Sequence, residues 1–259
     1  MSPVVAAALV VFVACTLLWL LSLRLRDSSI VDPFWGTGFL LCALTYAALT
    51  PGHGGPRGVL VLGLCALWSL RLSIFLLRRN HGKGEDFRYR RMREEAGPSW
   101  WWRSYLQVFV LQGALMLVIS QPLRAAMGSP ERPLGALDLA GGLVFAVGFF
   151  FEAVGDAQLA AFRADPSRRG QVLDTGLWRY SRHPNYFGDA AQWWGFYLFA
   201  IAGGGRETVY SPILMTALLL KVSGVALLER TLTKTKPGYE EYVRRTSAFI
   251  PRWPRPPRR

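Results

Sequence analysis

The stretch PVVAAALVVFVACTLLWLLSL, from Pro3 to Leu23, contains no charged side chain. A helix of about 20 apolar residues is long enough to cross the ~30 Å hydrocarbon core of a membrane. Six further apolar windows with little charge follow along the chain: Ile30–Leu49, Gly58–Leu77, Tyr105–Ser120, Leu137–Phe151, Ala190–Ala202 and Pro212–Leu228. We therefore expect an all-α fold, a polytopic membrane helical bundle with about seven transmembrane helices.

The 30 Lys and Arg residues give the chain a formal net charge of +13. Most of them lie in four segments that fall on one side of a membrane if the N-terminus is outside: residues 24–29, 78–104, 158–187 and 230–259. This asymmetry is typical of cytoplasmic loops, so we expect the N-terminus outside and the C-terminus in the cytoplasm. No basic groove outside the spans is interleaved with aromatic side chains, which argues against a nucleic-acid partner.

No linker or repeat divides the chain, so we expect residues 1–259 to form a single integral-membrane domain. The first apolar run is followed, not preceded, by basic residues, which favours a retained span over a cleaved signal peptide. Cys15, Cys42 and Cys65 lie in apolar windows without metal-ligand spacing. We expect these cysteines to be small buried hydrophobes.

Polar side chains are concentrated in the segment DTGLWRYSRHPNYFGDAAQWWGFY, residues 174–197, beside an apolar window. Pro184 ends any preceding helix. Asn185 is placed to cap the next helix, whose N-terminus is suited to binding an anion, and Asp189 lies one turn inside that helix. His183 lies in a loop near arginines with no second histidine nearby, so we expect no metal site.

Two carboxylates stand one turn apart in the fifth apolar region, GFFFEAVGDAQLAAFRAD. Glu152, Asp156 and Arg163 fall near one face of a continuing helix. Because two carboxylates repel each other in a medium of low dielectric constant, this spacing is costly without a cation or ligand. Either nearby arginines neutralise the pair, or a carboxylate receives the hydroxyl groups of a ribose.

Charged side chains also mark the second and third windows. Asp32 is either a capping or interfacial carboxylate or an acid that faces a substrate cavity, because carboxylates inside a membrane are costly. Arg71 and Arg78 share a helix face, and Arg71 either extends to the interface or holds an anion. The loop NHGKGEDFRYRRMR, residues 80–93, is either a plain cytoplasmic loop or a phosphate-binding loop of glycines and arginines.

The C-terminal segment KPGYEEYVRRTSAFIPR places Tyr239 and Tyr242 three residues apart on a short surface helix. This helix either docks on the membrane surface or closes over a cofactor from the cytoplasmic side. The prolines from Pro251 onward are incompatible with a helix. We expect this basic tail to lie along the membrane surface or to be disordered.

Five motifs taken together resemble the bacterial DUF1295 family of the steroid 5-alpha-reductase-like superfamily (3-oxo-5-alpha-steroid 4-dehydrogenase C-terminal domain): VDPFWG (31–36), RNHGKGEDFRYRRMR (79–93), FEAVGDAQLAAF (151–162), GLWRYSRHPNYFGD (176–189) and YEEYVRRTSAFIP (239–251). RHPNYFGD is also similar to the C-terminal motif of sterol C14 and C7 reductases. A looser RHPxYxG is shared with isoprenylcysteine and phospholipid methyltransferases. That motif alone therefore does not choose between NADPH and S-adenosylmethionine.

The resemblance implies a multi-span reductase that binds NADPH from the cytoplasmic face, with most of the cofactor motif in the C-terminal half, residues 135–251. Asn185 and Asp189 match residues that hold the ribose and nicotinamide. Asp156 and Arg163 match a cofactor-binding Asp and Arg on the preceding helix, and Arg71 with Arg78 or Arg79 matches phosphate contacts. We also expect Arg88, Arg179, Arg182, His183 and Tyr186 to bind the cofactor.

The catalytic pair departs from the steroid 5-alpha-reductases, which use a Glu and a Tyr to polarise the enone oxygen. The nearest matching positions here hold Asp32 and Trp68. A protonated Asp can donate a hydrogen bond, whereas Trp can donate its N–H but cannot relay a proton. The tyrosines that could replace the missing proton donor are Tyr46, Tyr89 and Tyr105.

We expect a reductase of the bacterial inner (cytoplasmic) membrane that uses NADPH to reduce a conjugated C=C bond in a steroid-like or other lipid substrate. Its partners would be an apolar lipid-like small molecule and membrane lipids. The first alternative is an S-adenosylmethionine-dependent methyltransferase of lipids or prenyl groups, which the many arginines disfavour because that cofactor carries no phosphate. The second alternative is a non-enzymatic lipid-binding or transport protein.

Overall fold

The structure is a computed structural model that describes residues 1–128, 132–222, 229 and 236–256. The chain divides into two compact units, one of Met1–Gly135 with Phe199–Thr208 and one of Ala136–Leu198 with Val209–Arg259. Most of the described residues lie in helices and none lies in a strand; one isolated β-bridge joins Ser181 and Ser247. The all-α expectation is therefore confirmed, whereas folding as a single domain stays a prediction.

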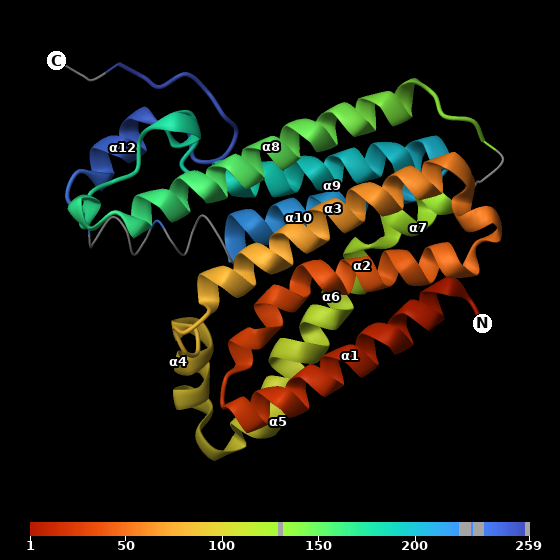
Figure 1. The fold of residues 1–259 in the computed structure, drawn as a ribbon, viewed down its shortest axis with the longest axis horizontal. Helices are drawn as coiled ribbons and strands as arrows, with labels where there is room; N and C mark the ends of the chain where they lie inside the picture. Colours follow the sequence, from red (N-terminus) through yellow and green to blue (C-terminus); the bar gives the residue numbers. More distant parts are fainter. Residues whose placement is uncertain (129–131, 223–228, 230–235, 257–259) are drawn as a thin grey trace. The chain divides into compact units, whose positions relative to one another are not determined.

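The first unit is built from long apolar helices and a chain of shorter ones (Figure 1). Its α-helices are α1 (Pro3–Leu25), α2 (Val31–Leu49), α3 (Gly55–Asn80), α4 (Phe87–Ala96), α5 (Trp100–Ser104), α6 (Leu111–Ile119) and α7 (Gln121–Met127). A π-helical stretch, Tyr105–Val110, joins α5 to α6. Short 3-10 turns precede α2 (Ser28–Ile30), α3 (Pro51–Gly54) and α5 (Gly97–Ser99).

Small side chains let α2 and α3 pack closely in the first unit. A Cβ atom at Gly36 would lie 2.5 Å from the backbone oxygen of Ser69. The backbone N–H of Thr37 donates to the hydroxyl of Ser73 at 3.1 Å. Together these contacts fix the register between the two helices and thereby the position of the polar residues at their ends.

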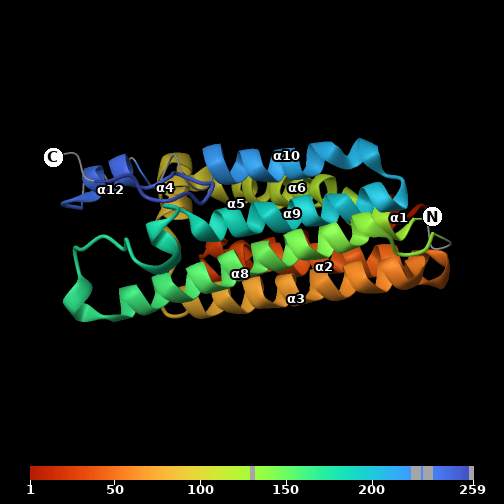
Figure 2. The ribbon, with the colours of Figure 1, turned by 90° about the horizontal axis from the view of Figure 1, so that it is seen from above.

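The second unit contains four helices that the structure describes: α8 (Ala136–Ala164), α9 (Pro184–Gly203, shared with the first unit beyond Leu198), α10 (Tyr210–Ala217) and α12 (Tyr239–Arg245). Helices α8 and α9 lie side by side in both ribbon views (Figure 2). Short 3-10 turns lie at Pro166–Arg168 and Gly176–Arg179, and a π-helical stretch, Leu218–Val222, follows α10. A further 3-10 turn, Arg206–Val209, belongs to the first unit up to Thr208.

Within the described part of the chain, five helical segments are long and apolar enough to cross a membrane: Pro3–Leu25, Ser28–Leu49, Pro51–Asn80, Phe87–Met127 and Ala136–Ala164. They contain the first five windows expected from the sequence and indicate a multi-pass membrane protein. The other two expected spans and the orientation of the termini stay predictions. The sixth window falls in α9, and the seventh begins in α10 and ends in residues 223–228, outside the described part of the chain.

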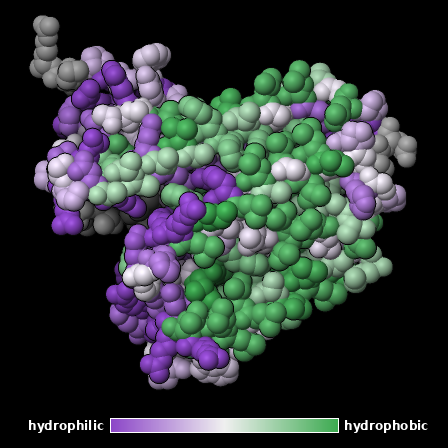
Figure 3. All heavy atoms as spheres, viewed as in Figure 1, coloured by the Kyte–Doolittle hydropathy of each residue, from purple (hydrophilic) through white to green (hydrophobic). Residues whose placement is uncertain are grey.

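Apolar side chains also cover the outside of the first unit, as a membrane-facing surface requires. Val5, Leu9, Phe12 and Leu17 of α1 are each at least half exposed. In Figure 3 the apolar colour follows α1, whereas the hydrophilic colour gathers around α4. The three cysteines are buried and free, as expected, and the described part of the tail beyond Pro251 is not helical, also as expected.

Candidate functional site

Glycines allow helices α8 and α9 to approach each other closely in the second unit. A Cβ atom at Gly188 would lie 2.4 Å from the backbone oxygen of Gly148, and one at Gly195 would lie 2.8 Å from that of Gly141. These distances leave no room for a side chain. The glycines recur at seven-residue spacing on both helices, so they form a continuous glycine seam that fixes the polar side chains beside it.

Two polar pairs join the helices beside this seam. The Asn185 side-chain amide donates to the Asp156 carboxylate at 3.0 Å, and the Gln192 amide donates to the Glu152 carboxylate at 2.6 Å. Glu152 and Asp156 are only 3% and 5% exposed. Because burying a carboxylate is costly unless it is hydrogen bonded, the two amides explain how α8 holds both acids. The predicted site residues Asp156 and Asn185 are thus brought together.

One acceptor in each pair has no hydrogen-bond partner among the described residues. These atoms are the buried Oδ1 of Asn185 and the buried Oε1 of Gln192. The expectation that Asn185 caps α9 is therefore wrong: α9 begins at Pro184, and its first backbone bond runs from Phe187 N–H to the His183 oxygen. Asn185 lies inside the first turn, where its side chain turns to α8 instead.

Arg182 connects the loop before α9 to later parts of the chain. Its guanidinium donates to both carboxylate oxygens of Glu229, at 2.7 and 3.0 Å, and to the backbone oxygens of Val243 and Thr246. All three of its nitrogens are therefore used within the protein. Arg182 was expected to bind the cofactor, and in this structure it holds the C-terminal segment against the loop.

His183 lies next to this ion pair, with its Nε2 at 3.2 Å from the Glu229 carboxylate. Its ring stacks on Tyr186 with a centroid distance of 5.5 Å. Burial alone would raise the pKa of Glu229, but the hydrogen bonds from His183 and Arg182 and the charge of Arg182 outweigh it and lower the pKa to about 2. Glu229 is thus ionised at neutral pH and fixes both basic residues.

Further hydrogen bonds attach the C-terminal segment to the same loop. The Tyr242 hydroxyl donates to the backbone oxygen of Trp178, and the Ser181 hydroxyl donates to that of Phe249 at 2.7 Å. Burial raises the pKa of Tyr242 well above its ordinary value, so its hydroxyl keeps the donated proton. Helix α12 and the loop are therefore held as one layer.

The remaining expected cofactor residues of the second unit lie around the seam and the loop. Asp189 is 8% exposed in the second turn of α9. Arg163 is exposed in the last turn of α8, and Arg179 is exposed in the turn before α9. With its 29 residues, α8 is about 43 Å long, so its end can reach beyond a ~30 Å hydrocarbon core into water.

In the first unit, Asp32 is part of a polar cluster between α2 and α4. Its carboxylate accepts hydrogen bonds from Arg88 at 2.7 Å and from the Tyr89 hydroxyl at 2.6 Å. Gln112 of α6 donates to the Tyr89 oxygen at 3.3 Å. Asp32 does not act as a simple helix cap here, because both of its oxygens face side chains of α4.

The loop before α4 is also fixed by its own acids. Glu85 accepts the backbone N–H of Ser28 at 2.8 Å and pairs with Arg93 at 2.7 Å. Burial raises the pKa of Glu85, but the hydrogen bonds from Arg93 and Ser28 outweigh it and hold this pKa below its ordinary value. Asp86 caps α4 by accepting the N–H of Arg88. Both acids of the expected phosphate-binding loop therefore bond to groups of the first unit.

The other expected residues of the first unit lie along α3. The buried Trp68 ring packs against Phe39 at a centroid distance of 5.6 Å. Arg71 lies over the Phe75 ring, Arg78 is exposed, and Arg79 donates to Asn80 at 3.1 Å. Asp32 and Phe39 are seven residues apart on α2, about 10 Å along the helix. Asp32 therefore contacts Arg88 and Tyr89, whereas Trp68 contacts Phe39, about 10 Å farther along α2.

Three contributors to these clusters were not singled out from the sequence: Glu229, Gln112 and Gln192. Each is a single polar residue in an apolar or basic context, and its partner is 23 to 47 residues away. For Glu229 and Gln112, no local sequence pattern indicates the contact. The glycine spacing on α8 and α9 was visible in the sequence and is the signal that could have located Gln192 beside Glu152.

The comparisons with known proteins agree with the motif pattern. The chain matches the family described as "Protein of unknown function (DUF1295)" over residues 18–246. It is 27% identical to "Uncharacterized protein C594.04c" of Schizosaccharomyces pombe over 278 residues, which cover 97% of this chain and 80% of that protein. No solved structure matches the chain. The membrane-spanning helices, the motifs and the family match lead to one conclusion: this chain belongs to the DUF1295 family.

Proposed function

We propose that this protein is a membrane-embedded reductase that uses NADPH to reduce a conjugated C=C bond in an apolar, lipid-like substrate. The proposal includes a cofactor site at the polar end of α8 and α9. It also includes the location expected from the sequence, a cytoplasmic membrane with the cofactor site on its cytoplasmic side. The apolar substrate would enter from the bilayer.

The observation that carries the proposal is the contact between the buried Asp156 and the partly buried Asn185. Two polar side chains 29 residues apart in sequence meet at 3.0 Å in an apolar helix seam. The Oδ1 atom of Asn185 is buried and has no partner among the described residues. A buried acceptor without a partner costs about 1–3 kcal/mol, a cost that a ligand hydroxyl or amide would remove.

The residues at this end of the second unit fit a phosphorylated dinucleotide. Ribose hydroxyls and a nicotinamide N–H₂ need acceptors, which Asn185 Oδ1 supplies together with the carboxylate of Asp156. Phosphates need cations at the aqueous end, where Arg163 is exposed in the last turn of α8. Arg182 is less suited to binding a phosphate than expected, because its nitrogens already donate to Glu229, Val243 and Thr246.

When bound, NADPH would supply a hydride, and the protein must hold a proton for the substrate. In the proposal this proton is on the Tyr89 hydroxyl, which donates to Asp32 at 2.6 Å. Arg88 donates to the same carboxylate at 2.7 Å, so both oxygens of Asp32 are hydrogen bonded. This pair of an acid and a tyrosine takes the role that the sequence comparison gave to Asp32 and Trp68.

Cofactor binding to the detergent-purified protein tests the proposal. Thermal unfolding would be followed with NADPH, NADH and S-adenosylmethionine, in the wild type and in the Asn185→Ala and Asp156→Asn variants. Gln107→Ala is the matched control, because this amide is exposed on the π-helical stretch of the first unit. We expect NADPH to raise the unfolding temperature of the wild type and the control, and to have little effect on the two site variants.

A response to S-adenosylmethionine in place of NADPH would refute the reductase and favour the methyltransferase. No response to any of the three would favour lipid binding or transport. If NADPH binds, consumption of NADPH in the presence of enone-bearing lipids tests the chemistry. Tyr89→Phe should then keep the NADPH-induced stabilisation and lose turnover, whereas equal loss of both would contradict the role of Tyr89.

A further inference from the structure

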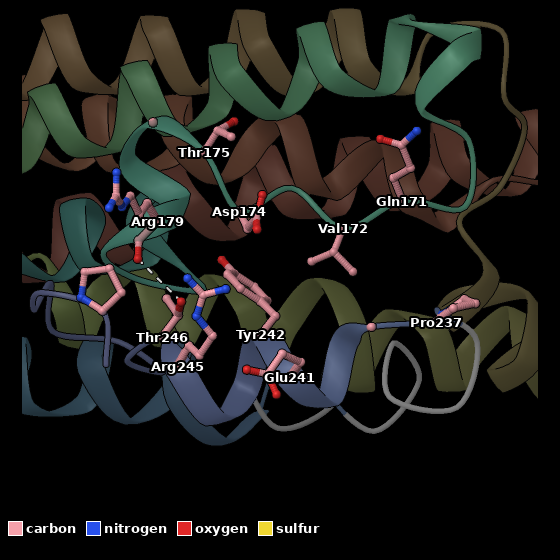
Figure 4. Close-up of a pocket in the computed structure, with 13 residues that line it drawn as sticks. Gln171, Val172, Asp174, Thr175, Arg179, Pro237, Glu241, Tyr242, Arg245 and Thr246 are labelled. Carbon is pink, nitrogen blue, oxygen red and sulfur yellow. Dashed lines mark hydrogen bonds between the residues drawn. The ribbon is translucent and has the colours of Figure 1, made fainter. Parts of the chain in front are cut away.

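A cavity of about 570 Å³ lies in the second unit between the loop 171–179 and helix α12 (Figure 4). Binding sites for small molecules are typically 300–1,000 Å³. The cavity is therefore large enough for a ligand of several functional groups and much larger than a single anion needs. None of the residues of the glycine seam lines it, so it is distinct from the Asp156–Asn185 site.

Three charged side chains of the lining have no ion pair with one another among the described residues: Asp174, Arg179 and Arg245. Asp174 comes from the loop wall and Arg245 from the α12 wall (Figure 4). The Nε of Arg245 is buried and lacks a hydrogen-bond partner within the described chain. A buried guanidinium donor without an acceptor is costly, and an anionic ligand would satisfy it.

The fourth charged residue of the lining, Glu241, is already neutralised. Its carboxylate accepts two hydrogen bonds from Arg244, at 3.0 and 2.6 Å. The lining thus presents two arginines for an anion and one carboxylate, Asp174, that can accept from hydroxyl groups. Thr175 adds a further hydroxyl to the loop wall.

The two walls are held at a fixed separation without a ligand. The hydroxyl of Tyr242 in α12 donates to the backbone oxygen of Trp178, and Thr246 donates to that of Arg179 at 3.4 Å. The backbone N–H of Arg252 donates to the Tyr180 oxygen at 3.0 Å. Because the walls are already joined, binding would not need to order them, which favours affinity.

We propose that this cavity binds a phosphate ester that carries free hydroxyl groups, with Arg179 and Arg245 on the phosphate and Asp174 on the hydroxyls. Arginine is suited to phosphate because its planar group donates two parallel hydrogen bonds. Two sources share this chemistry: the ribose phosphate of a nucleotide and the glycerol phosphate headgroup of a lipid. The proposal does not depend on NADPH being the cofactor.

Calorimetric binding to the full-length protein in detergent tests the inference with four probes. These are adenosine 2′-phosphate, glycerol 1-phosphate, inorganic phosphate and adenosine. We expect one or both phosphate esters to bind, and inorganic phosphate and adenosine to bind at least tenfold more weakly. The ester that binds identifies the source of the ligand.

Variants locate the site. Arg245→Met and Arg179→Gln should each weaken ester binding about tenfold or more, and Asp174→Asn should reduce the preference for esters over inorganic phosphate. Arg252→Gln is the matched control, because the Arg252 side chain is exposed and absent from the lining, and the substitution keeps the backbone N–H that bonds to Tyr180. Arg179 is an exposed rim residue, so its variant remains informative if Arg245→Met fails to fold.

Three results would overturn the inference: no ester binding, equal binding of inorganic phosphate, or equal losses in Arg252→Gln and Arg245→Met. Asn185→Ala separates this inference from the proposed function. It should leave ester binding unchanged even though it abolishes stabilisation by NADPH, because Asn185 does not line the cavity.

Discussion

Gly148 and Gly188 face each other across helices α8 and α9, with a Cβ atom at Gly188 only 2.4 Å from the backbone oxygen of Gly148. This close approach sets the distance between the helices. The same seam places Gln192 beside Glu152 and Asn185 beside Asp156. The stability of the second unit and the geometry of its candidate site therefore depend on the same glycines.

Gly188→Ala should destabilise the protein. Its new methyl group overlaps the α8 backbone, which cannot move as a flexible side chain could, so we expect a loss of about 1–3 kcal/mol. Thermal unfolding in detergent measures the effect. Gly63→Ala is the control, because a Cβ atom there meets nothing within 4 Å and alanine favours a helix by up to about 1 kcal/mol. Equal unfolding temperatures for the two variants would contradict the close packing of the seam.

Glu229→Gln should also destabilise the protein, because it leaves the Arg182 guanidinium, 8% exposed, without its carboxylate. Removing one partner of a buried ion pair costs about 3–5 kcal/mol, and the partial exposure of Glu229 places the expected loss near or below the lower value. Glu241→Gln tests an exposed pair of the same types, Arg244 and Glu241, and should cost less than about 1 kcal/mol. A similar loss of stability in both variants would contradict the expectation that the buried pair of Arg182 and Glu229 stabilises the protein more than the exposed pair does.

The same carboxylate predicts a pH dependence of stability. The pKa of Glu229 is about 2 in the folded protein, below its ordinary value of 4.5. A lowered pKa means that protons bind more readily to the unfolded chain, so stability is present above about pH 4.5 and is lost as the pH falls toward 2. The difference in unfolding temperature between wild type and Glu229→Gln should therefore shrink over this range. A difference that stays constant would show that Glu229 is not the titrating group.

Arg88→Met should destabilise the first unit more than Arg91→Met does. Arg88 pairs with Asp32, whose side chain is 14% exposed, whereas the pair of Arg91 and Glu95 is largely exposed. We expect a loss of about 2–3 kcal/mol for Arg88→Met, since a mostly buried carboxylate loses its cation, and less than about 1 kcal/mol for Arg91→Met. Thermal unfolding measures the loss of stability in each variant. The rate of trypsin cleavage after Lys83 measures how firmly the loop before α4 is held. Equal cleavage rates in the two variants would exclude a role of Arg88 in fixing this loop.

Much of the fold could be predicted because its causes are local. An apolar run such as Pro3–Leu23 has the length of a bilayer, and its burial in lipid needs no information about the rest of the chain. The same holds for Glu152, Asp156 and Arg163, whose places on α8 follow from helical periodicity. The sequence could not show that α9 begins at Pro184 with Asn185 turned toward Asp156, because that choice depends on the neighbouring helix.

Hydropathy and helical spacing therefore predict a helical membrane protein and the residues that form its polar clusters. The partner of each polar residue within a unit follows only from how the helices pack. Asp32 meets Arg88 across 56 residues, and Arg182 meets Glu229 across 47. The physical reason is that hydropathy and helical spacing act over one helix, whereas ion pairs and buried hydrogen bonds are selected by which helices pack together.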